Sequence, residues 1–190
     1  MIALDVDGVV ANSISLLRSV IKYSYGIDIY NHIETYRIPH LFPNWDIGPF
    51  FEDCMINFGH AVEPYPDAKE ACQLLLKENS FPLIFLTARR ESLKEITKNW
   101  LSQKLGLPKD YFSVMMKSSS NKKFYIEKSG IEFFVEDRLR TANEIAELPS
   151  VKISYLINRQ WNIGRDSHPK VVRKNNLLEC VKNYLKTNKS

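Results

Sequence analysis

Residues 1–13 read MIALDVDGVVANS and contain the pattern on which the fold prediction depends. The apolar run at residues 2–6 leads into acidic residues and a glycine, which predicts a buried strand followed by a turn. Asp5 and Asp7 lie two positions apart, so their side chains point to the same side of an extended chain. One carboxylate can attack phosphorus and the other can transfer a proton, although a bare pair of this kind is as often a solvated acidic turn.

Downstream of this stretch, apolar runs of strand length alternate with segments of helical periodicity. Strands are predicted at 82–86, 111–116, 132–135 and 152–157, and helices at 13–25, 66–79, 91–105, 121–129, 141–147 and 176–186. Such alternation predicts an α/β fold with a Rossmann-like parallel sheet and helices on both faces. Ligands of these sheets bind beyond the carboxyl ends of the strands.

Residues 27–63 break the alternation and are rich in aromatic residues and proline. A stretch of this length without strand periodicity is often a lid or binding segment, built here from short helices. We therefore expect residues 1–11 and 66–190 to form a catalytic core and residues 12–65 to form a small helical cap.

Polar residues follow each predicted strand after the first. The Thr87 hydroxyl and the Ala88 N–H could hold phosphate oxygens at a helix N-terminus, although a threonine there is more often a plain helix cap. Lys122 and Lys123 lie near a helix start, where a cation is unfavourable. One of them would balance the charge of a nucleophile and a phosphoryl group, although an isolated lysine more commonly serves solubility.

Glu136 and Asp137 follow the next predicted strand and form an adjacent pair of carboxylates. Such a pair is costly after an apolar strand unless a cation lies nearby. Oxygen ligands favour Mg²⁺ over Zn²⁺. The ion would bridge Asp5, a phosphate group and this acidic pair.

In these motifs the chain resembles the haloacid dehalogenase (HAD) superfamily of phosphatases. The stretch DVDGVVANS resembles the first motif of that superfamily, LIFLTAR the second, and NKKFYIEKSGIEFFVEDR the third and fourth. The resemblance implies that Asp5 is the nucleophile of an aspartyl-phosphate mechanism. It also implies that Asp7 is the general acid and base, with its main-chain carbonyl offered to Mg²⁺, and that Thr87 and a lysine bind phosphate.

The same resemblance leaves two assignments open. Aspartate is more usual than glutamate at position 136, so either Glu136 or Asp137 is the direct Mg²⁺ ligand, and we favour Asp137. Lys122 has a spacing to Glu136 similar to that in the superfamily, and Lys123 is the alternative.

A narrower resemblance links the chain to the 5′(3′)-deoxyribonucleotidase-like family. It is based on the small cap, the TAR and EDR motifs, and Gln160-Trp161-Asn162 in place of a Pro-Trp/Tyr-Asn pattern. It implies a nucleoside monophosphate as substrate. Trp45, Phe50 and Phe51 are then candidates for stacking on the base, against the alternative that they fill the core of the cap.

Composition limits the other classes of function. A formal charge of +4 and a pI near 8.9 permit a phosphatase for nucleic-acid ends, but no basic stripe with interleaved aromatic residues favours a stable nucleic-acid partner. A non-catalytic phosphate-binding protein is a further alternative. Three cysteines without CxxC spacing and the lack of a long apolar run predict a cytoplasmic protein without a membrane partner. The oligomeric state stays open.

Overall fold

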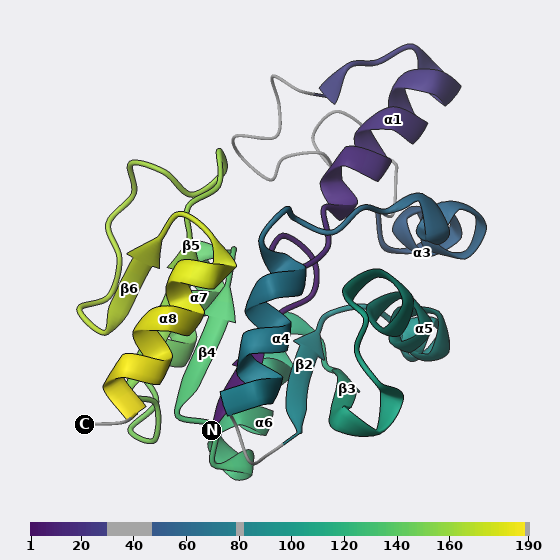
Figure 1. The fold of residues 1–190 in the computed structure, drawn as a ribbon. Coiled ribbons are helices and arrows are strands. Elements are labelled where there is room, and N and C mark those ends of the chain that lie inside the picture. The colour runs from purple at the N-terminus through teal and green to yellow at the C-terminus, as the bar shows by residue number, and fades with distance from the viewer. Residues whose placement is uncertain (30–46, 79–81, 189–190) are drawn as a thin grey trace.

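The computed structural model describes residues 1–29, 47–78 and 82–188. In these residues six strands form one parallel sheet in the order β3-β2-β1-β4-β5-β6 (Figure 1). The strands are β1 (Ile2–Leu4), β2 (Leu83–Thr87), β3 (Phe112–Met116), β4 (Phe133–Glu136), β5 (Ile153–Ile157) and β6 (Val171–Lys174). The predicted α/β class, with a parallel sheet covered by helices, is confirmed.

The strand order reverses beside β1, between β1 and β4. The chain extends from β1 through β2 to β3 on one side, and then continues from β4 to β6 on the other. β1 pairs in parallel with both β2 and β4. A doubly wound sheet opens a crevice beyond the carboxyl ends of its strands at such a switch point. Asp5 and Glu136 lie at this edge.

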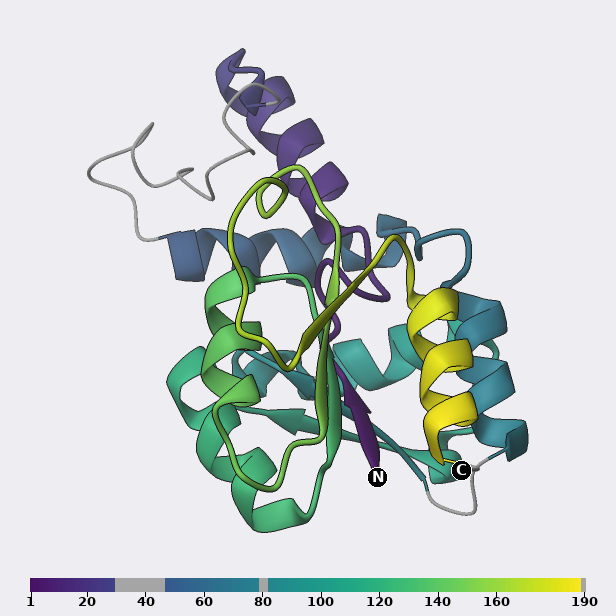
Figure 2. The same cartoon turned by 90° about the vertical axis from the view of Figure 1, so that its left-hand side faces the viewer.

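Helices cover both faces of the sheet (Figures 1 and 2). One face packs against α4 (Ala68–Glu78), α5 (Lys94–Leu105) and α8 (Leu177–Asn188), and its core includes Phe85, Phe133, Trp100 and Tyr184. The opposite face packs against α6 (Ser119–Ser129) and α7 (Leu139–Ala146), through a smaller apolar cluster that contains Phe134, Ile126 and Ile145. Burial of this apolar surface is the main stabilising contribution to the fold.

Between β1 and the crossover helix α4, the structure describes three inserted helical segments. They are α1 (Ser13–Tyr25), α3 (Ile47–Phe58) and the 3₁₀ helix η2 (Gly59–Ala61). Both views place α1 and α3 beyond the carboxyl ends of the strands, and the two helices contact each other. These two helices therefore lie on the side of the sheet where ligands are expected. Trp45, one of the predicted recognition residues, lies outside the described residues.

The sequence prediction missed one strand, β6, and merged a 3₁₀ turn with the helix that follows it. β6 is a four-residue edge strand that is mostly half-buried and ends in Arg173 and Lys174, so it has no long apolar run. The helix predicted at 91–105 is a 3₁₀ turn, η3 (Glu91–Leu93), followed by α5. Among the described residues, no helix is both long and apolar enough to cross a membrane.

Candidate active site

Asp5 follows β1 directly and lies deep in the crevice. Its main-chain N–H donates to the carbonyl of Val135 at 2.9 Å, which continues the pairing between β1 and β4. The residue is 5% exposed, and its Oδ1 accepts the N–H of Val6 at 2.7 Å. The second oxygen, Oδ2, lies 2.7 Å from Nζ of Lys122. Backbone and lysine thus fix the orientation of this carboxylate.

Lys122 is the member of the lysine pair that enters the site. Its side chain is 2% exposed, and Nζ also lies 3.1 Å from Oε2 of Glu136. Burial alone would lower the pKa of Lys122, but the charges of Asp5 and Glu136 raise it above its ordinary value. Lys123 lies at the surface instead, with Nζ 3.0 Å from Oε2 of Glu147.

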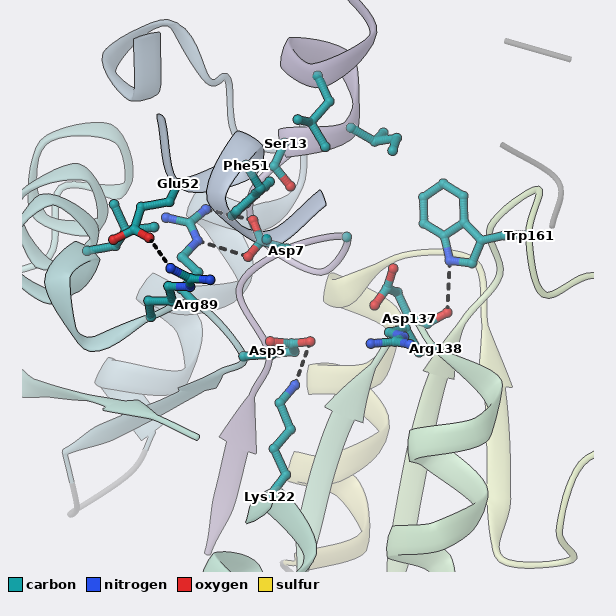
Figure 3. Close-up of a pocket in the computed structure, with 17 residues that line it drawn as sticks. Asp5, Asp7, Ser13, Phe51, Glu52, Arg89, Lys122, Asp137, Arg138 and Trp161 are labelled. Atoms are coloured by element: carbon teal, nitrogen blue, oxygen red, sulfur yellow. Dashed lines mark hydrogen bonds and ion pairs between the residues drawn. The ribbon is translucent and has the colours of Figure 1, made fainter. Parts of the chain in front are cut away.

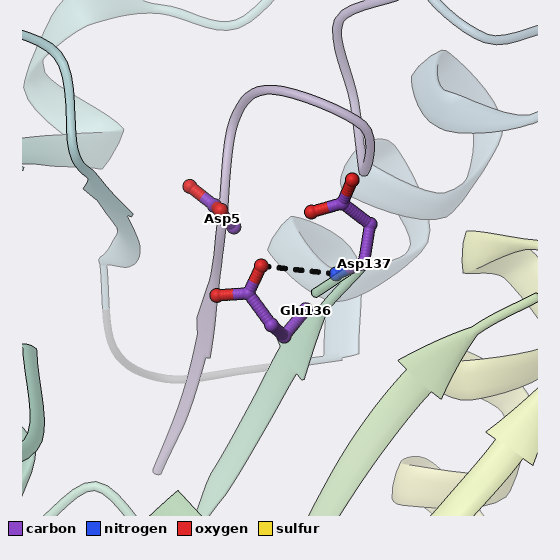
Figure 4. Close-up of side chains that lie close together, drawn as sticks. All are labelled: Asp5, Glu136 and Asp137. Carbon is purple, nitrogen blue, oxygen red and sulfur yellow. Dashed lines mark hydrogen bonds between the residues drawn. The ribbon is translucent and has the colours of Figure 1, made fainter. Parts of the chain in front are cut away.

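Asp5, Glu136 and Asp137 converge beyond the ends of β1 and β4 (Figure 4). One ligand oxygen from each lies within 4.8 Å of the others, and all three residues are buried. Burial, reinforced by the charge of Glu136, raises the pKa of Asp5 well above its ordinary value, and burial likewise raises the pKa of Glu136. Three converging carboxylates are disfavoured unless a cation compensates them, so the donor set fits a hard ion such as Mg²⁺.

The carboxylates of Glu136 and Asp137 have different surroundings. Oε1 of Glu136 accepts the main-chain N–H groups of Asp137 and Arg138, both at 3.1 Å, and Oε2 accepts from Lys122. Both oxygens of Glu136 therefore hold the loop and the lysine. The carboxylate of Asp137 faces the loop after β1 and lines the cavity described below. This geometry favours Asp137 as the direct ligand.

Gly8 allows the loop after β1 to approach the acidic cluster. Its φ of +79° lies in the left-handed region, and a Cβ built at this position would lie 2.0 Å from Oδ2 of Asp137. The Gly8 carbonyl accepts from Nε of Arg159 at 2.9 Å. A residue with a side chain would be strained by its backbone and would displace Asp137.

Asp7 points away from Lys122 and forms a two-pronged ion pair with Arg89 (Figure 3). Nε and Nη2 of Arg89 donate to the two carboxylate oxygens at 2.8 and 2.7 Å. Burial would raise the pKa of Asp7, but the charge and hydrogen bonds of Arg89, with a hydrogen bond from Ser13, lower it below its ordinary value. The two carboxylates of the DxD pair thus have opposite pKa shifts, which is typical of groups with different roles.

Arg89 was missed by the sequence analysis, which selected its neighbours Thr87 and Ala88. Thr87 ends β2, is fully buried, and accepts the main-chain N–H of Arg89 on its Oγ1 at 3.3 Å. Ala88 lines the cavity, whereas Thr87 is not among the lining residues. The available signal was an arginine two residues after the end of a strand, in a sequence that also contains an acidic loop after its first strand.

The Gln160-Trp161-Asn162 segment supports Asp137 from the side of β5. Nε1 of Trp161 and Nδ2 of Asn162 both donate to the main-chain carbonyl of Asp137, at 3.1 and 2.7 Å. Asn162 is fully buried and also donates to the Ile157 carbonyl at 2.8 Å. The segment therefore fixes the loop that carries the acidic pair, a role that the sequence analysis did not predict.

A cavity of about 440 Å³ opens between this site and the inserted helices. Its floor includes Asp5, Asp7, Lys122 and Asp137. Its walls include apolar residues of the inserted helices and of the core (Ile14, Leu17, Phe51, Leu93 and Trp161). Of the two described aromatic candidates, Phe51 lines the cavity. Phe50 packs against the apolar cluster of Ile21, Ile29 and Trp161 instead.

Comparison with known proteins identifies the fold. Neither a family model nor a curated protein matches the chain. Solved structures do match over nearly the whole length. An L-2-haloacid dehalogenase from Xanthobacter autotrophicus, with chloropropionic acid covalently bound, aligns at a TM-score of 0.57 and 12% identity over 96% of this chain and 97% of that one. The chain has the haloacid dehalogenase-like fold.

Two further HAD-like hydrolases give the same result. A haloacid dehalogenase-like hydrolase from Burkholderia xenovorans aligns at a TM-score of 0.60 and 11% identity, over 95% of this chain and 96% of that one. A HAD-like family hydrolase from Xanthomonas campestris aligns at 0.58 and 12%, over 98% and 96%. At this level of identity the likeness concerns the fold, and the chemistry must be argued from the site residues.

Proposed function

We propose that the protein is a Mg²⁺-dependent phosphomonoester hydrolase that forms an aspartyl-phosphate on Asp5. The observation that carries this proposal is that Asp5 and Asp7, two carboxylates of the same loop, have different partners. Asp5 contacts Lys122 and the acidic cluster, whereas Asp7 contacts Arg89. A nucleophile and a proton carrier need this difference, because they must act on opposite sides of the same phosphorus atom.

In the first step, an oxygen of Asp5 attacks phosphorus and forms a P–O bond. The bond between phosphorus and the leaving oxygen breaks, and the protonated form of Asp7 gives its proton to that oxygen. Lys122, 2.7 Å from Asp5, lies where it can offset the negative charge of the phosphoryl group. The products of this step are an alcohol and the aspartyl-phosphate.

In the second step, Asp7 acts in its ionised form. It takes a proton from a water molecule, whose oxygen attacks phosphorus while the P–O bond to Asp5 breaks. Inorganic phosphate leaves, Asp5 is restored, and Asp7 again carries the proton that it lost in the first step. The ion pair with Arg89 favours the ionised carboxylate, which suits this role as a base.

Mg²⁺ would be held by the carboxylates of Asp5 and Asp137 and by the main-chain carbonyl of Asp7. When bound, the ion neutralises negative charge on the phosphoryl oxygens and on the acidic cluster. The convergence of three buried carboxylates supports this assignment. Glu136 would complete the site by holding Lys122 and the Asp137 main chain in place.

The structural neighbours raise a second candidate, displacement of halide from a haloacid. That reaction also uses a covalent intermediate, as the bound chloropropionic acid in the Xanthobacter autotrophicus enzyme indicates for that protein. Halide is a weak base and leaves without a proton donor, so such a reaction does not need a proton carrier for its leaving group. Asp7 and the acidic cluster both have a purpose in phosphomonoester hydrolysis, which is why we favour it.

For the substrate, we propose a nucleoside monophosphate, with residues 12–65 as a cap over the reacting group. The apolar wall formed by Ile14, Leu17, Phe51 and Trp161 supports a leaving group with a flat, apolar part. The three cysteines, all buried and free, agree with a reducing compartment such as the cytoplasm.

Release of inorganic phosphate from a panel of nucleotides, sugar phosphates and aryl phosphates, with Mg²⁺ or with EDTA, tests the proposal. We expect Mg²⁺-dependent turnover that is absent in Asp5→Asn, a variant that keeps the size of the side chain. Chloride release from 2-chloropropionate and phosphate release from 5′-phosphorylated oligonucleotides test the competing substrates. Turnover of 2-chloropropionate with no turnover of any phosphate ester would refute the proposal.

A further inference from the structure

Arg89 has a place in the site that its position in the sequence did not reveal. It is 5% exposed although it borders the cavity, and its guanidinium group donates two hydrogen bonds to the two oxygens of Asp7. The fork of an arginine matches the plane of a carboxylate, so two such bonds fix the rotation of the carboxyl group as well as its position.

Arg89 is anchored by hydrogen bonds to buried residues of the core. Its Nη1 donates to Oγ1 of Thr97 at 3.0 Å, and Thr97 lies fully buried in α5. Its main-chain N–H donates to Thr87 at the end of β2. Anchoring on two core elements makes Arg89 a rigid support for the more exposed Asp7, whose side chain is 26% exposed.

The guanidinium also contacts the inserted segment. Its central carbon lies 5.9 Å from the ring centre of Phe51 in α3, within the range of a cation–π contact. The next residue, Arg90, forms an ion pair with Glu52, the neighbour of Phe51, with Nη1 2.9 Å from Oε2. The loop after β2 therefore contacts both Asp7 and the helix that covers the cavity.

A second cation, Lys122 in α6, is another potential partner of Asp7. The positive charge of Lys122 lies near enough to act on the Asp7 carboxylate. If Asp7 turned toward this lysine, it would join the acidic cluster and leave the side of the cavity that faces the leaving group. The fork of Arg89 prevents that rotation and keeps the two carboxylates of the DxD pair apart.

We propose that Arg89 is a positioning residue, which orients Asp7 for proton transfer to the leaving oxygen. This inference rests on the proposed hydrolase function. It assigns Arg89 no contact with the substrate, because its effect reaches the reaction through Asp7.

The test compares two substrates that share an aromatic ring and differ in leaving group. Benzyl phosphate releases a strongly basic alkoxide that needs a proton, whereas p-nitrophenyl phosphate releases a stable phenolate that does not. The quantity to compare is kcat/KM, which reports the steps up to formation of the aspartyl-phosphate. In Arg89→Gln and Arg89→Lys we expect kcat/KM to fall about 100-fold or more for benzyl phosphate and less than about 10-fold for p-nitrophenyl phosphate, because general acid catalysis contributes 10²–10⁴-fold.

The lysine variant separates orientation from charge. Lysine keeps a positive charge but cannot form the fork, so it should remain selectively impaired. Recovery of benzyl phosphate turnover in Arg89→Lys would show that charge alone suffices and would overturn the proposal. Equal losses on both substrates would overturn it as well, because they indicate a structural role. Arg90→Gln, which changes the adjacent arginine, should not discriminate between the leaving groups.

A measurement without turnover checks the contact itself. In ¹⁵N-labelled, metal-free protein, the Nε–H of Arg89 should exchange slowly with solvent, and this protection should disappear in Asp7→Ala. Rapid exchange in the wild type would contradict the ion pair on which the proposal depends. If the wild type hydrolyses neither phosphate ester although the Nε–H is protected, the contact exists but the proposed hydrolase function is wrong. The role of Arg89, which rests on that function, is then refuted as well.

Discussion

Lys122 and Asp5 form a buried ion pair, with Nζ 2.7 Å from Oδ2, although two strands, β2 and β3, separate them along the chain. The same ammonium group lies 3.1 Å from Glu136, so one lysine compensates two buried carboxylates. Lys122 therefore offsets part of the negative charge of the acidic cluster.

The first prediction concerns this lysine. Lys122→Met leaves Asp5 and Glu136 buried without their cation, so the free energy of unfolding should fall by about 3–5 kcal/mol and turnover should be lost. Lys123→Met is a matched control in the adjacent position, where an exposed pair with Glu147 contributes about 0–1 kcal/mol. Urea denaturation of both variants measures the difference, and equal stability would contradict it.

The second prediction concerns the cation ligand. Asp137→Asn should reduce the rise in melting temperature that Mg²⁺ produces, because that rise reports the affinity of the folded protein. Glu136→Gln disturbs hydrogen bonds to Lys122 and to two main-chain N–H groups, so it should lower stability in EDTA but keep most of the Mg²⁺ effect. The opposite order in a Mg²⁺ titration would exchange the two roles.

The third prediction uses the close approach of Gly8 to Asp137. Gly8→Ala should lower the free energy of unfolding by roughly 2–3 kcal/mol and remove the stabilisation by Mg²⁺, because the new Cβ collides with the Asp137 carboxylate. Gly26→Ala is the control, since Gly26 has a similar φ of +67° with nothing within 4 Å of its added Cβ. It should cost only the backbone strain of about 1–2 kcal/mol and leave the Mg²⁺ effect intact.

Much of the site was predictable because chemistry-bearing residues follow consecutive strands. In a parallel sheet those carboxyl ends meet at one edge, so Asp5, Lys122 and the pair at 136–137 were expected to lie together. The contact between Arg89 and Asp7 was not predictable, since it joins residues 82 positions apart and depends on two side-chain rotamers.

The recognition residues show a second limit of sequence reasoning. Phe50 and Phe51 are adjacent in α3 and identical in type, and neighbouring residues on a helix point in directions about 100° apart. Which one faces the cavity depends on how α3 packs against α1 and Trp161, a tertiary contact that composition does not reveal.

The fourth prediction concerns the pH dependence of stability that arises from the ion pair between Glu132 and Lys152. Hydrogen bonding from Lys152, whose Nζ lies 2.7 Å from Oε1, lowers the pKa of Glu132 below its ordinary value. A carboxyl group with a lowered folded-state pKa stabilises the fold above its unfolded pKa of about 4.3, and this stability is lost as the pH falls through the folded value. Glu132→Gln should therefore reduce stability by about 0–1 kcal/mol at neutral pH and by nothing at about pH 2. A difference that persists in acid, measured by urea denaturation across this range, would contradict the assignment.

The last prediction separates the two phenylalanines of α3. Phe51 lines the cavity, so Phe51→Ala should raise KM for a nucleotide more than for p-nitrophenyl phosphate, by roughly 5- to 150-fold if a stacking contact of about 1–3 kcal/mol is lost. Phe50 packs against Ile21, Ile29 and Trp161, so Phe50→Ala should lower the free energy of unfolding by roughly 1–3 kcal/mol and affect both substrates alike.

These two variants form a matched pair, because the residues share a helix, a side chain and a neighbouring position. Kinetics with both substrates, measured beside urea denaturation, distinguishes recognition from packing. A substrate-specific effect at Phe50 with none at Phe51 would reverse the assignment. Equal losses on both substrates in Phe51→Ala, together with lowered stability, would mean that this ring also serves the packing of α3. The apolar wall of the cavity would then contribute to folding and leave recognition of the leaving group to other residues.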